Sequence, residues 1–126
     1  MFTPELHLEH TDARGEIYSI TLPGDQELML LHSKAGSLRG GHSHDVDEIV
    51  VVLTGKMGYH KVLDGKEVMD VVKAGEGSFN KAGVVHMGQF EEDSWLVEWR
   101  VNTRKGKSKN SDYPAWRERV VANSAG

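Results

Sequence analysis

Short hydrophobic runs recur along the chain and are separated by glycines. In several of these runs apolar and polar positions alternate, which is typical of half-buried β-strands. The run Glu-Ile-Val-Val-Val-Leu at 48–53 is rich in β-branched side chains, which favour a strand over a helix. We predict strands over residues 16–22, 27–32, 48–53, 67–72, 77–80, 85–90 and 94–101.

The turns agree with many short strands. Asp64-Gly65 lies between two hydrophobic runs, which predicts a two-residue β-hairpin. Glycines at close intervals suit tight turns and do not suit long helices. Without an internal repeat, the pattern predicts an all-β fold, an antiparallel barrel or jelly roll.

The run 95–101 alternates Trp, Val, Trp and Val with the remaining positions. This alternation predicts that Trp95 and Trp99 pack in the core. Glu98 and Arg100 share the opposite face, so only one of the two sets can point inward.

The character of the chain changes after Asn102. Residues 103–111 contain Lys105, Lys107 and Lys109 among serines and a glycine, which indicates a solvated linker. Asp112-Tyr113-Pro114 then precedes 115–122, where an early proline allows a short helix. We expect one barrel domain over residues 1–102 and a polar linker and C-terminal tail over 103–126.

Composition narrows the class of protein. A chain of 126 residues is one ordinary domain, and a net charge of -4 argues against nucleic-acid binding. The absence of cysteine excludes disulfides and thiolate sites. No secretory signal is visible at the start, and the longest aliphatic run is too short to span a bilayer. We expect a cytoplasmic protein without a nucleic-acid or membrane partner.

Candidate chemistry is concentrated between Gly36 and Glu48. His42, His44 and Glu48 are separated by even numbers of residues, so an extended chain can place them on one face. His86, at the start of another predicted strand, is a fourth candidate. Three imidazoles and one carboxylate suit a divalent transition metal (Fe, Mn, Ni, Zn, Co or Cu) and leave coordination positions open.

The other histidines, and the acids beside Glu48, have no useful spacing. Asp45 and Asp47 have the opposite parity and are expected to face outward. Glu48 begins an aliphatic run, and a buried carboxylate needs a cationic partner. The remaining histidines are expected to be surface residues without a functional role: His7, His10, His32 and His60.

These residues resemble the two sequence motifs of the cupin superfamily. Gly36-x5-His42-x-His44-x3-Glu48-x6-Gly55 is similar to the first motif at every specified position. Gly75-x5-Lys81-x-Gly83-x2-His86-x3-Phe90 resembles the second, with lysine in place of proline and phenylalanine in place of asparagine. The resemblance implies a cupin barrel in which His42, His44, Glu48 and His86 bind metal.

The resemblance leaves the activity open, because one fold hosts many functions. We expect a metal-dependent oxygenase, isomerase or lyase that acts on a small organic molecule. A non-catalytic sugar or metabolite binder is one alternative. A sugar-nucleotide epimerase or ketoisomerase is another, since Asp12-Ala13-Arg14-Gly15 looks similar to the opening of those cupins, which generally work without metal.

Two further residues are candidates for the site because of where the predicted strands and loops place them. A turn at Gly55-Lys56 would pair Val52 with Tyr59 and place the phenol in the cavity as a proton donor. Arg39, in the loop expected to enter the ligand cluster, is a candidate for binding an anionic substrate. Gln89 has the opposite parity to His86 and is a weaker candidate.

The run 48–53 is apolar on both faces, whereas a monomeric barrel would normally leave one face in water. Together with the family resemblance, this favours a homodimer.

Overall fold

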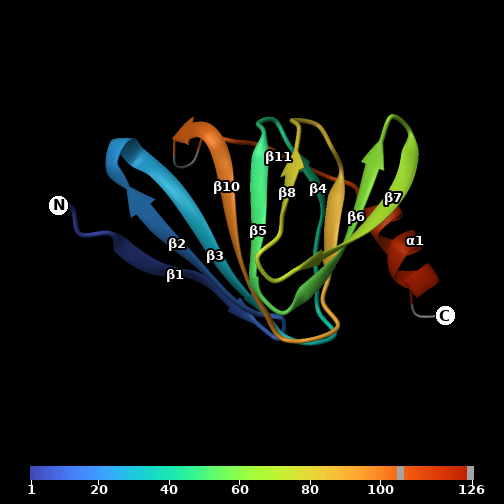
Figure 1. Ribbon diagram of the computed structural model, residues 1–126. Helices are drawn as coiled ribbons and strands as arrows, with labels where there is room; N and C mark the ends of the chain where they lie inside the picture. Colours follow the sequence, from blue (N-terminus) through green and yellow to red (C-terminus); the bar gives the residue numbers. More distant parts are fainter. Residues whose placement is uncertain (105–106, 125–126) are drawn as a thin grey trace.

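Two antiparallel β-sheets face each other, and one helix lies on the outer surface of one of them (Figure 1). The computed structural model describes residues 1–104 and 107–124. In spatial order, the first sheet contains β1 (Glu5–Asp12), β2 (Gly15–Leu22), β3 (Gln26–Ser33), β10 (Ser94–Arg104), β5 (Glu48–Thr54) and β8 (Gly77–Asn80). The second contains β11 (Asn110–Asp112), β4 (Leu38–His44), β9 (His86–Gln89), β6 (Lys56–Leu63) and β7 (Lys66–Lys73).

The predicted fold class is confirmed. Each predicted strand is present with small differences in its ends, and a 3₁₀ turn over Pro23–Asp25 joins β2 to β3. The predicted hairpin is also present: Leu63 pairs with Lys66, and both turn residues have positive φ, 50° at Asp64 and 77° at Gly65. In the described part of the chain, no helix has the length and apolar character needed to cross a bilayer.

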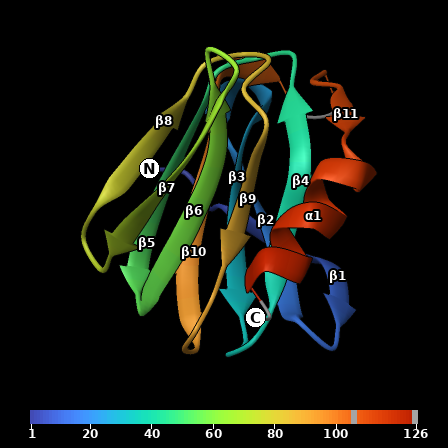
Figure 2. The same ribbon diagram turned by 90° about the vertical axis from the view of Figure 1, so that its right-hand side faces the viewer.

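The segment after Asn102 is more ordered than the sequence predicts. β10 continues to Arg104, and β11 pairs with the edge of β4. Helix α1 (Pro114–Ser124) buries Trp116 and Val120 against Met87 of β9. Figure 2 shows α1 lying over β4, with β11 beside it.

The short helix allowed at 115–122 is present as α1, whereas the expected polar linker is corrected for the described residues, since 110–112 form a strand; Lys105 lies outside them. The Asn-Ser-Asp sequence of β11 has no strand propensity of its own. Its strand conformation depends on backbone pairing with β4, which local pattern does not show.

The predicted core position of the tryptophans is wrong. Leu96, only 2% exposed, points into the barrel, and Glu98 and Arg100 line a cavity on the same face. Trp95 lies on the outer face of the sheet, 36% exposed, where it stacks on His32 with ring centroids 4.7 Å apart. Leu53 and Phe79 are also exposed, and the expected homodimer stays a prediction.

The predicted Gly55-Lys56 hairpin is also wrong. β5 pairs with β10 and β8, whereas β6 pairs with β7 and β9, so Gly55 is the corner where the chain crosses between sheets. Its φ is +82°, and a Cβ there would lie 2.6 Å from the carbonyl oxygen of Asp93 and in collision with Ser94 Oγ. Ser94 Oγ in turn accepts a hydrogen bond from the Lys56 amide, so it cannot move without cost.

We expect Gly55→Ala to destabilise the protein by about 3 kcal/mol, because left-handed backbone strain adds to a steric collision. Gly65→Ala is the matched control: its φ is +77°, but nothing lies within 4 Å of the added Cβ. We expect it to cost about 1 kcal/mol. Urea unfolding measures both, and equal losses would contradict the close approach at the corner.

Candidate metal centre

Four side chains from three strands meet at one end of the barrel interior. His42 and His44 lie on β4, His86 begins β9 and Glu48 begins β5. Ligand nitrogens of the three histidines lie within 4.8 Å of one another. Glu48 Oε2 is 3.1 Å from His44 Nε2, and Glu48 Oε1 is 3.5 Å from His86 Nε2. The structure thus brings together all four predicted metal ligands.

The conformation of β4 explains how its side chains reach this cluster. His42 pairs directly with His86 across the β4–β9 ladder, and the register shifts between Gly40 and His42. Gly40 and Gly41 both have positive φ, +104° and +87°, a conformation that glycine adopts readily and that accompanies the β-bulge here. The bulge lets Arg39 and His42 line the same cavity although their sequence spacing is odd.

Glu48 is almost fully buried, with 1% of its side chain exposed. Burial alone would raise its pKa, but His44, His86 and Arg100 outweigh this effect and hold the pKa below its usual range. Arg100 Nε lies 3.8 Å from Oε2. Neither carboxylate oxygen makes an aligned hydrogen bond, and His44 Nε2 is in the same position. The carboxylate therefore has ionisable neighbours at short range but no well-aligned hydrogen bond.

Neighbouring oxygens fix the orientation of two imidazoles. His86 Nδ1 donates to the carbonyl oxygen of Val84 at 3.0 Å, and His44 Nδ1 lies 2.6 Å from Asn110 Oδ1. Both rings therefore present Nε2 to Glu48, as ligating histidines do when a second partner sets their tautomer. Sequence reasoning missed Asn110, which lies in the segment expected to be a linker.

The donor set fits a divalent transition metal. Metal–ligand bonds of about 2.1 Å place neighbouring ligand atoms about 3.0–3.4 Å apart, close to the two separations from Glu48. Nitrogen and carboxylate donors suit the first-row divalent ions. A cation at this position would also give the oxygens of Glu48 a direct partner in place of the aligned hydrogen bonds they lack.

A cavity of about 300 Å³ adjoins the cluster. Tyr59 lines it, as expected, although the predicted hairpin is not what places it there. Asn80 Nδ2 donates to the phenol oxygen at 2.7 Å, which leaves the phenol hydrogen available to another acceptor. Burial and the negative charge of Glu48 raise the pKa of Tyr59 well above its ordinary value, so the phenol stays neutral.

Arg39 also lines this cavity. Expected in a loop, it lies instead on β4 with 8% of its surface exposed. The other histidines contact partners away from the cluster: His32 contacts Glu16 and His60 contacts Gln89. The two exposed histidines have acidic partners: His7 contacts Glu5, and His10 contacts Asp12.

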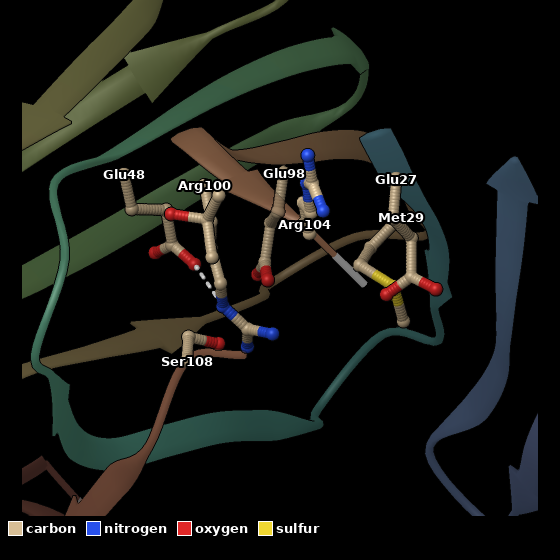
Figure 3. A pocket seen from close by; sticks show the side chains of 8 residues that line it. Glu27, Met29, Glu48, Glu98, Arg100, Arg104 and Ser108 are labelled. Atoms are coloured by element: carbon tan, nitrogen blue, oxygen red, sulfur yellow. Dashed lines mark ion pairs between the residues drawn. The ribbon is translucent and has the colours of Figure 1, made fainter. Parts of the chain in front are cut away.

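Two charged residues in the barrel wall were not predicted as site residues. Glu98 and Arg100 project from β10 beside Glu48, and Figure 3 shows Arg100 between the two carboxylates. Burial and the negative charge of Glu48 raise the pKa of Glu98 to about 8. The alternation of 95–101 does place Glu98 and Arg100 together on one face, but the pattern predicts that this face points outward.

Comparison with solved structures shows that the chain has the cupin fold. Similar structures are the capsular polysaccharide assembling protein CapF from Staphylococcus aureus, at 17% identity and TM-score 0.70, and oxalate decarboxylase from Bacillus subtilis, at 20% and 0.66. The 7S globulin of Momordica charantia matches at 16% and 0.68. The three matches cover 89%, 97% and 83% of this chain, respectively.

These identities show the fold alone. The matches cover 32%, 34% and 34% of the other chains, so this chain spans about a third of their length. No family model matches the sequence, and no curated protein matches it.

The metal-free protein should lose stability as pH falls from 6.5 to about 4. Burial, with the charges of His86 and His44, lowers the pKa of His42 from 6.5 to about 4, so in this window the unfolded chain binds the proton more readily. Urea unfolding across the window, with a chelator present, should show a shallower fall for His42→Asn. His7→Asn, on exposed β1, serves as the control. Identical slopes for His42→Asn and wild type would contradict the shift.

We expect Asn110→Ala to lower the pKa of His44. Burial lowers this pKa, but contacts with Glu48 and Asn110 outweigh burial and raise it, because both ring nitrogens face oxygen acceptors. NMR titration of the metal-free protein measures the change. Ser111→Ala, on the same strand, should leave the titration unaltered. An unchanged His44 in Asn110→Ala would show that the amide does not orient the ring.

Proposed function

We propose that this cupin-fold chain binds one divalent transition ion, Fe, Mn, Ni, Zn, Co or Cu, through His42, His44, Glu48 and His86. The observation that carries the proposal is the burial of Glu48 beside the three histidines, with two imidazole Nε2 atoms within 3.5 Å of its oxygens and no aligned hydrogen bond to either oxygen. The one permanently charged partner described for this carboxylate, Arg100, lies 3.8 Å away, and a metal ion would bind both the carboxylate and the imidazoles directly.

We further propose that the bound ion serves catalysis on a small organic molecule held in the adjoining cavity. Such an ion supplies Lewis-acid polarisation of a substrate oxygen or, if redox-active, electron transfer. The residues favour an enzyme over a purely structural metal site, because three imidazoles and one carboxylate leave coordination positions open and the adjoining cavity is lined by proton-bearing groups.

The cavity residues have distinct roles in this proposal. Tyr59 donates a hydrogen bond from its neutral phenol to a substrate oxygen. Glu98, with a pKa of about 8, carries a proton at neutral pH and can protonate a developing negative charge. Arg39 binds the negative charge of the substrate. The reaction class that fits these groups is oxygenation, isomerisation or elimination.

A non-catalytic binding protein is the second candidate. The fold neighbours include oxalate decarboxylase and also the 7S globulin and hazelnut vicilin, so the fold does not decide between catalysis and binding. The alternative of a metal-independent sugar-nucleotide epimerase or ketoisomerase has less support. Arg14, central to it, is already held by Asp12 Oδ2, 2.7 Å from Nη2.

The purified protein should contain one transition-metal ion per chain by elemental analysis. His42→Ala and Glu48→Gln should each reduce occupancy at least tenfold, because each removes a direct ligand. His60→Ala, outside the cluster and bonded to Gln89, should retain it. Full metal occupancy in both His42→Ala and Glu48→Gln would exclude this site. Tight binding of a nucleotide sugar by metal-free protein would favour the sugar-nucleotide epimerase or ketoisomerase alternative.

A further inference from the structure

The cavity has two chemically different ends. The candidate metal centre lies at one end, where His42 pairs with His86. Arg39 pairs with Gly88, and Gly88 also pairs with Tyr59, so these residues lie at a deeper level of the same sheet. The bulge sets the three steps of β4 from Arg39 to His42 against two steps of β9, from Gly88 to His86, which is roughly 7 Å at the rise of a strand.

Arg39 is a buried cation without a carboxylate partner in the part of the chain described here. Its Nε donates to Ser33 Oγ at 2.6 Å, and its Nη2 donates to the carbonyl oxygen of His32 at 3.0 Å. Both acceptors are neutral. They fix the plane of the guanidinium. The charges of Asp12, Glu98 and Glu16 act on Arg39 from beyond ion-pair distance, so this side chain, 8% exposed, has no direct anionic contact among the described residues.

The other arginines that line the cavity are different, because each already has an acid beside it. Arg14 makes hydrogen bonds to Asp12 through Nε and Nη2 and is partly exposed. Arg100 lies 3.8 Å from Glu48. Of the three described cavity arginines, Arg39 is thus the one without a carboxylate in direct contact, and its guanidinium can take a ligand carboxylate there.

Between the two ends the cavity wall is apolar. The side chains there come from both sheets and are at most 4% exposed: Leu31, Val50, Met57, Phe90 and Leu96. They form the main hydrophobic cluster of the protein. A ligand segment in contact with them gains free energy only if it is hydrocarbon.

We propose that the cavity takes an elongated organic monoanion, with oxygen donors at the metal end, a hydrocarbon middle and a terminal carboxylate bound to Arg39. The oxygen-donor end rests on the function proposed above. A carboxylate matches the planar fork of a guanidinium. One buried positive charge balances one negative charge, which favours a carboxylate over a dianionic phosphate monoester.

Two hydroxamates that differ at the far end test this assignment. Suberic acid monohydroxamate ends in a carboxylate, and octanohydroxamic acid ends in a methyl group. Calorimetry on the zinc-loaded protein should show about tenfold tighter binding of the acid, because a charge-assisted bidentate contact is added. In Arg39→Met the preference should disappear while octanohydroxamic acid still binds.

Two variants separate a role in binding from a role in folding. Arg14→Gln should keep the preference, since Asp12 already neutralises that arginine. Arg39→Lys keeps the charge without the fork and should keep part of the preference. If Arg39→Met does not fold, the lysine variant and the wild-type ligand pair decide. Equal affinities for the two hydroxamates, or a preference that survives at full size in Arg39→Lys, would overturn the assignment.

A second experiment, on metal-free protein, distinguishes failure of this proposal from failure of the metal site. Octanoate, octanamide and octyl phosphate are titrated into chelator-treated protein and followed by NMR. A preference for octanoate that needs Arg39 supports the carboxylate subsite even if the protein binds no zinc. Equal binding of octanoate and octanamide, or tighter binding of octyl phosphate, rejects the carboxylate.

Discussion

The buried carboxylate of Glu48 is the constraint on which this end of the barrel depends. It lies at the start of β5 in one sheet, and its nearest cationic or ionisable partners come from both sheets: His44, His86 and Arg100. Removal of any partner would leave a charge in an environment that cannot solvate it. Electrostatics therefore holds the facing sheets together where the apolar core ends, and the same grouping supplies the donors for a metal.

Features that depend on short sequence spacing could be predicted. Strands such as β5 and β8 follow from local composition, and the four candidate ligands follow from spacing in two short motifs. Features that depend on distant pairing could not. Asn110 reaches His44 across 66 residues, and the β-bulge at Gly40 and Gly41 becomes visible only in the pairing of β4 with β9.

The alternation in β10 illustrates a further limit. Period-two patterning shows that the two faces of a strand differ, but it does not show which face is inside. In a barrel with a ligand cavity, charged residues face inward to line the cavity. Glu98 and Arg100 therefore occupy the interior, and Trp95 covers the outer sheet surface instead.

The pairing of β11 with β4 has a consequence for biosynthesis. Asn110 leaves the ribosome 66 residues after His44, which is roughly 3–13 s at ordinary translation rates. During that interval the nascent chain exposes one unpaired edge of the strand that carries two of the histidines, and such edges recruit foreign strands. Arrival of residues 110–112 closes that edge, so synthesis of this segment is also the step that protects it from aggregation.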